Sequence, residues 1–247
     1  MLKVYKDLEE LSQAAAQLLL EAAQSATKKR GKFSLVLSGG NTPRRLYELL
    51  AEEPYRDQMP WSTTHVFWGD ERCVPAGDER NNAHMARQIL LDRVPIPDEQ
   101  IHNMASTLPP IKAAEEYQNT LEAYFSGQPP AFDFVLLGLG ENGHTASLFP
   151  ETAVLDEKRY WVSEVYVPNQ QMWRVTLTAP ILNQAKKIVF LVEGASKALV
   201  LDQVVNGARH PKQLPAQLIQ PQNGELLWLV DRAAASLIQK DTERSTE

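Results

Sequence analysis

Apolar runs of strand length alternate with segments of helical periodicity along most of this 247-residue chain. The runs at 33–37, 65–68 and 132–137 are followed by helical patterns at 43–51 and 82–91 and by a short helical turn. Strands that are joined through helices pair in parallel, with the helices packed on the sheet. The alternation therefore predicts an α/β fold built on a mainly parallel sheet.

The remaining segments extend this pattern, with a looser region after Pro150. A first strand is expected at the start of the chain, and apolar spacing predicts helices at 8–29, 108–125 and 196–205. Further strand candidates lie at 161–167, 174–178, 188–192 and 226–230. We expect a closing helix at 231–240, a frayed polar tail at 241–247 and a single domain over residues 1–247, because the sequence shows no repeat or linker.

Composition and charge exclude several classes of protein. The formal net charge of -6 lacks the basic footprint of a nucleic-acid binder, and no apolar stretch is long enough to cross a bilayer. The first residues show no secretory signal, and the lone Cys73 can form no internal disulfide, which agrees with a reducing compartment. The sequence therefore predicts a cytoplasmic protein whose partner is a small molecule rather than nucleic acid or a membrane.

Four loops that follow predicted strands carry the candidate functional residues. The first loop, Ser38-Gly39-Gly40-Asn41-Thr42, lies between a strand and a helix that is expected to begin at Pro43. Its glycines let a ligand approach the backbone, and N–H groups at the start of a helix favour an anion such as phosphate. A tight turn without a ligand would use the same residues.

The second loop places charged residues at the end of a strand. Asp70, Glu71 and Arg72 follow the apolar run at 65–68. Charge clusters usually face solvent, but open α/β sheets bind ligands beyond the carboxyl ends of their strands. This position favours a role in a binding site.

The third loop, Gly138-Leu139-Gly140-Glu141-Asn142-Gly143-His144, matches the glycine fingerprint of dinucleotide-binding folds. That fingerprint requires a long helix after the third glycine, and Pro150 would end such a helix after about two turns. We therefore reject a nicotinamide site and expect the glycines to expose His144, either as a catalytic group or as a structural histidine.

The fourth loop, at 193–197, ends in Lys197, which either supplies a point charge to a phosphate or is simply a solvated residue at the start of a helix. Arg174 lies near the start of a predicted strand, where an isolated arginine is usually on the surface.

Together these segments resemble the 6-phosphogluconolactonase family, within the glucosamine-6-phosphate isomerase/6-phosphogluconolactonase superfamily. The matching motifs are Ser-Gly-Gly-Asn-Thr-Pro at 38–43, Asp-Glu-Arg at 70–72 with Asn82 downstream, Gly-Leu-Gly-Glu-Asn-Gly-His-Thr-Ala-Ser-Leu-Phe-Pro at 138–150, Arg-Val-Thr-Leu-Thr at 174–178 and Gly-Ala-Ser-Lys at 194–197. The resemblance implies a Rossmann-like fold with an open, mainly parallel sheet and helices on both faces, related to glucosamine-6-phosphate deaminases. It also implies that no cofactor is needed.

The resemblance implies a role for each matching residue. His144 would be the general base, with Asp70 and Arg72 as its catalytic companions. The substrate and its phosphate would be bound by Ser38, Gly39, Gly40, Asn41, Thr42, Asn82, Asn142, Arg174 and Lys197. Many relatives have Asp where this chain has Asn142, and an asparagine there can hydrogen-bond but cannot act as a base.

The implied reaction is hydrolysis of 6-phospho-D-glucono-1,5-lactone to 6-phospho-D-gluconate, in the oxidative pentose phosphate pathway. We hypothesise that His144 activates a water and then protonates the departing ring oxygen, while Arg72 and loop N–H groups hold the negative charge. No metal is needed for these steps, and the other histidines of the chain show no ligand spacing.

Three alternatives remain. A deaminase-isomerase acting on a hexosamine phosphate would share the fold, but such enzymes typically carry an Ile-Ala-Phe-Asn-Glu-Pro type run where this chain has Thr-Ala-Ser-Leu-Phe-Pro at 145–150. A cysteine hydrolase would pair Cys73 with His144. A non-catalytic sugar-phosphate sensor would carry a DNA-binding module, for which we expect no room in this chain.

Overall fold

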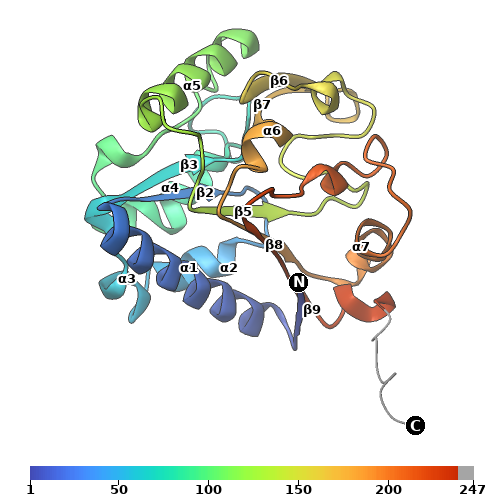
Figure 1. Cartoon of the computed structure of the whole chain (residues 1–247), viewed down its shortest axis with the longest axis horizontal. Coiled ribbons are helices and arrows are strands. Elements are labelled where there is room, and N and C mark those ends of the chain that lie inside the picture. The colour runs from blue at the N-terminus through green and yellow to red at the C-terminus, as the bar shows by residue number, and fades with distance from the viewer. Residues whose placement is uncertain (239–247) are drawn as a thin grey trace.

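A six-stranded parallel sheet organises the molecule, which we describe over residues 1–238 from a computed structural model (Figure 1). Its strand order is β1-β9-β8-β5-β2-β3, and every pairing within it is parallel. The strands are β1 (Leu2–Tyr5), β2 (Phe33–Leu37), β3 (Thr64–Trp68), β5 (Phe134–Gly138), β8 (Lys187–Val192) and β9 (Glu225–Asp231). The predicted mainly parallel α/β sheet is confirmed.

Helices flank the sheet on both sides, as Figure 1 shows with α1, α2 and α3 on one side and α5 on the other. The helices are α1 (Leu8–Arg30), α2 (Arg44–Leu50), α3 (Tyr55–Gln58), α4 (Asn82–Ile89), α5 (Pro110–Phe125), α6 (Ala179–Leu182) and α7 (Ala198–Val205). The longest helix, α1, begins where the Asp7 carboxylate accepts the Glu10 N–H and ends at Gly31, whose φ of 73° suits glycine.

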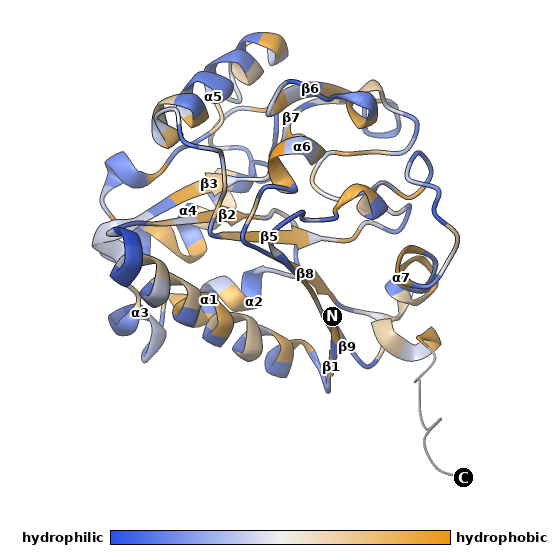
Figure 2. Cartoon of the chain, in the orientation of Figure 1, coloured by the Kyte–Doolittle hydropathy of each residue, from blue (hydrophilic) through white to orange (hydrophobic). Residues whose placement is uncertain are grey.

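The central strands are covered on both faces. All five residues of β2 are buried, and β5 and β8 are buried over most of their length. Figure 2 shows these strands as the hydrophobic centre of the molecule, with hydrophilic residues on the outer surfaces of the helices. This double burial explains why the sequence shows continuous apolar runs here rather than an alternation of apolar and polar residues.

A second, antiparallel sheet was not expected from the sequence. Its strands β4 (Asp70–Arg72), β7 (Met172–Leu177) and β6 (Val162–Val167) lie in the order β4-β7-β6. Gly69 joins the two sheets, because its N–H donates to Leu37 O at 3.0 Å and its carbonyl accepts the Leu177 N–H at 2.8 Å. Residues 70–72, predicted as a loop, are therefore a short strand.

Two other predictions of secondary structure are wrong. The short helical turn expected after the run at 132–137 is absent, because residues 139–150 form consecutive turns. A closing helix was expected over 231–240, but β9 extends to Asp231, and up to residue 238, where the description ends, only a 3₁₀ turn follows at Ala234–Leu237. The buried Asp231 carboxylate ends the strand by accepting the N–H groups of Ala234 and Gly194.

The predicted polar tail at 241–247 lies outside the described residues, and a single domain over 1–247 stays a prediction. Across residues 1–238 there is no helix with both the length and the apolar character that crossing a membrane requires.

Candidate active site

The loops that follow four neighbouring strands of the parallel sheet line one cleft. The strands β8, β5, β2 and β3 are consecutive in the sheet, and the predicted loops follow their carboxyl ends. The chain order reverses between β5 and β2, where open α/β sheets form a binding crevice. The cleft is lined by Ser38, Gly39, Gly40, Asn41, Thr42, Pro43, Asp70, Arg72, Gly138, Leu139, Gly140, His144, Thr145, Ala146, Arg174 and Lys197. All the predicted site residues except Asn82 and Asn142 are among them.

The loop after β5 holds the His144 ring in a fixed place. The Gly140 N–H donates to His144 O at 2.8 Å, and the Gly143 N–H donates to Gly140 O at 2.9 Å. A Cβ atom on Gly140 would lie 2.0 Å from the His144 ring, so only glycine leaves room for the ring. The His144 ring also stacks on the ring of Phe149, with the two centroids 4.1 Å apart.

Asn142 fixes the tautomer of His144. Its Oδ1 lies 3.3 Å from the His144 backbone nitrogen and 2.5 Å from Nδ1 of the ring. Since the backbone N–H can only donate, the side-chain atom facing it is the oxygen, and the ring must then donate from Nδ1. The other ring nitrogen, Nε2, keeps its lone pair and can accept a proton. Asn142 therefore orients the histidine instead of lining the cleft.

The surroundings of His144 keep its ring neutral. The pKa of His144 is lowered to about 4, chiefly by burial; Asp70 raises the pKa, and the cations Arg174, Lys197 and Arg72 lower it. At neutral pH the unprotonated ring is therefore the prevailing form.

Asp70 forms the centre of a buried polar cluster. Its Oδ2 lies 2.5 Å from Ser147 Oγ and 3.3 Å from Nη1 of Arg174. Arg174 is only 6% exposed, and its Nη2 donates to Gln170. Arg174 is buried rather than on the surface, because the antiparallel pairing of β4 with β7 sets it opposite Arg72, two residues along β4 from Asp70. Ser147 was missed, since a serine in an irregular loop leaves no periodic signal in the sequence.

Asn82 contacts two of the residues that line the cleft, Asp70 and Gly39, without lining it. Its Nδ2 donates to Asp70 O at 2.9 Å, and a Cβ on Gly39 would lie 2.0 Å from its Oδ1. The buried Glu71 carboxylate accepts the N–H groups of Asn82 and Ala83, which fixes the start of α4 against β4. Burial raises the pKa of Glu71 to about 7. Asn82 thus packs the first loop against Asp70 rather than facing the cleft.

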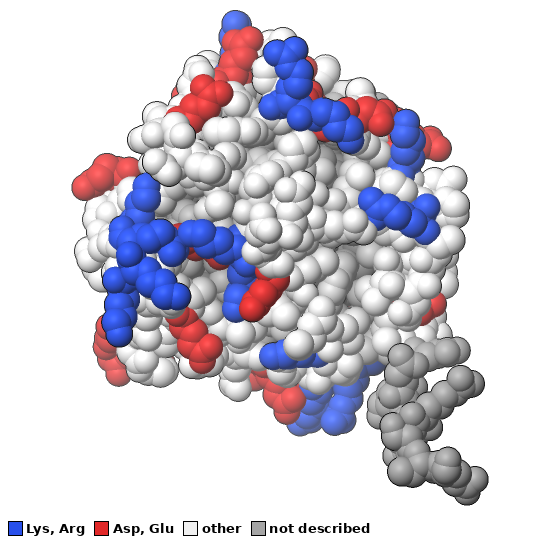
Figure 3. Space-filling model, in the orientation of Figure 1, with Lys and Arg blue, Asp and Glu red and all other residues white. Residues whose placement is uncertain are grey.

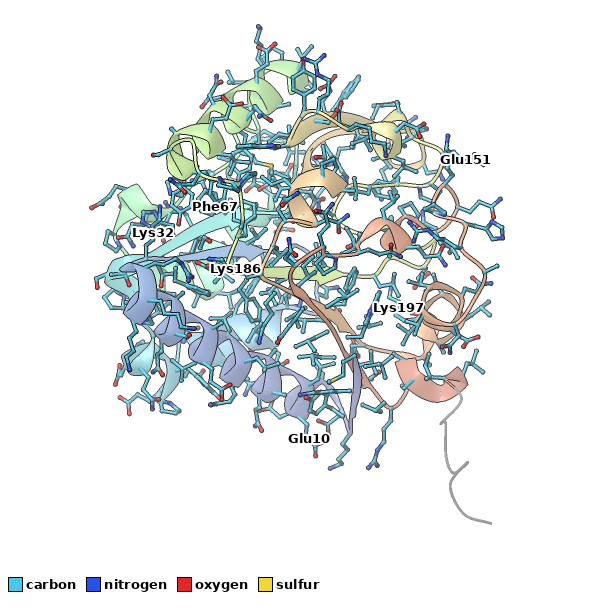
Figure 4. All side chains as sticks on the ribbon, in the orientation of Figure 1. Glu10, Lys32, Phe67, Glu151, Lys186 and Lys197 are labelled. Atoms are coloured by element: carbon cyan, nitrogen blue, oxygen red, sulfur yellow. The ribbon has the colours of Figure 1, made fainter. Side chains whose placement is uncertain are left out.

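The first loop and Lys197 also line the cleft. The Tyr47 hydroxyl donates to Ser38 O at 2.7 Å and accepts the Ser38 N–H at 3.0 Å, which fixes the start of the loop. Within residues 1–238, the N–H groups of Gly39 and Gly40 make no hydrogen bond to the protein. Lys197, in the 3₁₀ turn Ala195–Lys197 that follows β8, lines the cleft, and Figure 4 shows it at the opposite end of the sheet from Lys186.

The geometry does not support Cys73 as a nucleophile. Burial and the neighbouring Glu71 raise the pKa of the Cys73 thiol to about 11, so the reactive thiolate is scarce at neutral pH. Cys73 also lines a different cavity from His144. As for metal ligands, no cluster of three or more His, Cys, Asp or Glu side chains suited to an ion occurs in the described part of the chain.

Comparison with known proteins identifies the family. The family model described as "Glucosamine-6-phosphate isomerases/6-phosphogluconolactonase" matches residues 6–228. A protein named 6-phosphogluconolactonase from Synechocystis is 44% identical over 230 residues, which cover 88% of this chain and 93% of that protein. The solved 6-phosphogluconolactonase of Trypanosoma brucei superposes with a TM-score of 0.85 and 29% identity, over 97% of this chain and 98% of its own.

A monomeric glucosamine-6-phosphate deaminase superposes with a TM-score of 0.79 over 96% of this chain and 99% of its own, at 22% identity. This similarity confirms the predicted relation in fold. The chain belongs to the glucosamine-6-phosphate isomerase/6-phosphogluconolactonase family.

Proposed function

We propose that this member of the family is a 6-phosphogluconolactonase, which hydrolyses 6-phospho-D-glucono-1,5-lactone to 6-phospho-D-gluconate in the oxidative pentose phosphate pathway. The names of the Synechocystis and Trypanosoma brucei proteins support this activity. The observation that carries the proposal is the neutral His144, held by Asn142 with its Nε2 unprotonated, in a cleft that also contains three cationic side chains.

In the first step, Nε2 of His144 takes a proton from water as the water oxygen attacks the lactone carbonyl carbon. The carbonyl oxygen becomes an oxyanion, which the guanidinium group of Arg72 stabilises. Arg72 suits this role because its side chain lines the cleft together with His144. Asp70 balances the cations and stabilises the imidazolium that forms.

In the second step, the bond between the carbonyl carbon and the ring oxygen breaks. The imidazolium returns its proton to the departing ring oxygen, which becomes a hydroxyl group, and the carbonyl carbon is left as a carboxylic acid. The low pKa of His144 favours this return of the proton. Water is thereby added across the ester bond, and His144 is again neutral.

The phosphate binds away from the reacting carbonyl, at residues 38–42 and Lys197. The N–H groups of Gly39 and Gly40, which have no partner within residues 1–238, and the Lys197 ammonium would together bind an anion. Arg174, which the resemblance placed at the phosphate, is paired with Asp70. In our proposal Arg174 stabilises Asp70 instead of serving as the main phosphate ligand.

A turnover assay tests the proposal. Fresh lactone is supplied, and the rate above spontaneous hydrolysis is followed by trapping the acid with its dehydrogenase. Ammonia release from glucosamine 6-phosphate would favour the deaminase instead, and tight binding without turnover would favour a sensor. We also propose a cytoplasmic location, which cell fractionation tests.

A further inference from the structure

We propose that Ser147 is a positioning residue, which directs the Asp70 carboxylate so that one of its oxygens stays available to the cleft. The inference rests on the proposed lactone hydrolysis, because its effect is measured on that reaction. Ser147 is completely buried and does not line the cleft, so it can act on the substrate only through another residue.

The two oxygens of Asp70 have unequal surroundings. Oδ2 accepts from Ser147 Oγ at 2.5 Å and from Arg174 Nη1 at 3.3 Å. Oδ1 has only a long contact of 3.5 Å with Asn82 Nδ2 within residues 1–238. An ionised carboxylate has about four acceptor positions, so Oδ1 keeps capacity for a water or a substrate hydroxyl.

The single hydroxyl proton of Ser147 determines this arrangement. A carboxylate and a guanidinium flank the hydroxyl, with Arg174 Nη1 3.5 Å from Oγ. Arg174 can only donate, so the proton of Ser147 points to Asp70. The Ser147 N–H donates to Thr176 Oγ1 at 3.1 Å, which anchors the serine to β7. The hydroxyl therefore holds Oδ2 at a fixed point and leaves Oδ1 as the free oxygen.

The other end of the sheet provides a matched control. Ser34 Oγ donates to Oδ2 of Asp133 at 3.2 Å, and both residues are buried. Arg30 and Lys186 pair with Oδ1 of Asp133 at 2.5 and 2.7 Å. Ser34→Ala therefore removes a buried serine–aspartate hydrogen bond that also lies next to cations, but far from the cleft.

The test compares Ser147→Ala with Ser34→Ala in the full chain. Removal of a hydrogen bond to a charged group has a typical effect of roughly ten- to a hundredfold, so Ser147→Ala should lower kcat by that factor with KM changed less than threefold. The same loss is expected for gluconolactone without phosphate. Ser34→Ala should lower the urea midpoint and leave kcat unchanged. If Ser147→Ala does not fold, Ser147→Cys, a weaker donor of similar size, should show a smaller loss in the same direction.

A double-variant comparison separates positioning from general damage. If Ser147 acts through Asp70, then Ser147→Ala should cost less than about twofold in kcat when Asp70→Asn is already present. Additive losses, or a folded Ser147→Ala with the kcat of the unsubstituted chain, overturn the inference. Absence of lactone turnover in the unsubstituted chain would instead contradict the proposed function, so the two failures are distinct.

Discussion

Asp70 and Asp133 lie at opposite ends of the parallel sheet and are equally buried, with 7% of each residue exposed. Each accepts from a buried serine and pairs with at least one cation. Asp133 uses both oxygens fully, because Oδ1 faces two cations and Oδ2 accepts from Ser34 Oγ and the Ser34 N–H. Asp70 has a nearly free Oδ1. A buried aspartate with every acceptor position filled stabilises the fold, whereas one with a free position can act on a ligand.

Positive charge alone does not distinguish the two ends. Figure 3 shows a group of Lys and Arg side chains on the left of the molecule, near the carboxyl end of α1. The last turn of this helix contains Lys28, Lys29 and Arg30. These cations are exposed and complement the carboxyl end of the helix. The cleft instead combines its three cationic side chains with a neutral histidine and with backbone N–H groups that have no partner within residues 1–238, and this combination supports the proposed site.

The largest effect is expected at the histidines. His144→Gln should lower kcat roughly 10²–10⁴-fold, because a positioned general base is removed. The control is His65→Gln, since His65 pairs with His102 near the amino end of the sheet, at 3.2 Å between Nδ1 and Nε2. It should keep kcat within about twofold. Steady-state kinetics and circular dichroism check both variants, and a folded His144→Gln with near-normal kcat would exclude His144 as the base.

The aspartates should separate activity from stability. Asp70→Asn is expected to lower kcat by roughly ten- to a hundredfold, because the charge that stabilises the imidazolium is lost. Asp133→Asn should instead destabilise the fold by about 1–3 kcal/mol, since Arg30 and Lys186 lose a charged partner. Urea unfolding and kinetics on the folded fraction measure the two effects. If both variants lost only stability, the proposed contrast between the two ends would be wrong.

Sequence reasoning found the loops that line the cleft, but not the side chains that fix these loops in place. The alternation of strands and helices placed residues 38–42 and His144 at the carboxyl edge of the sheet, where the structure has them. Asp70–Arg72 was taken for a loop because a three-residue charged strand has no detectable alternation. The partners of Asp70 come from β7 and from residue 147, more than 70 positions away, and such pairing depends on the second sheet.

The roles of single residues were harder to predict than their presence in the site. Arg174 was recognised by resemblance, but its burial follows from the β4–β7 pairing, which no local pattern indicates. Asn142 was expected to bind substrate, and the structure directs it to His144, two residues along the same turn. Hydrogen bonds within an irregular loop depend on backbone angles that propensity does not determine.

Lys186, which precedes β8, and Lys197, in the turn that follows it, test where the phosphate binds. Lys197→Ala should raise KM for the phosphorylated lactone by roughly tenfold with little change in kcat, because contacts remote from the carbonyl are equal in ground and transition states. Its rate with unphosphorylated gluconolactone should be unchanged. Lys186→Ala at the amino end should leave KM unaffected (Figure 4). An equal loss with both lactones would place Lys197 in the chemistry rather than at the phosphate.

The smallest and most specific effect is expected from Asn142→Asp. In the unsubstituted chain the pKa of His144 is lowered to about 4, so kcat/KM should stay level from pH 7 down to about pH 5 and decline only below it. An aspartate would accept the Nδ1 proton and pair with the imidazolium, and a nearby opposite charge typically raises a pKa by 1–3 units.

The acid limb of the profile should therefore move upward into the range of about pH 5–7, because the raised pKa makes protonation of the base occur at higher pH. Asn183→Asp is the matched control. Asn183, which precedes β8, donates to Leu218 O and accepts the Gln220 N–H, so its substitution should not shift the acid limb. Measurements of kcat/KM between pH 4 and 7 avoid the rapid alkaline hydrolysis of the lactone. If the acid limb of the unsubstituted chain lies near pH 6.5, burial does not lower the pKa of His144. If the limb does not move in Asn142→Asp, residue 142 does not contact the ring.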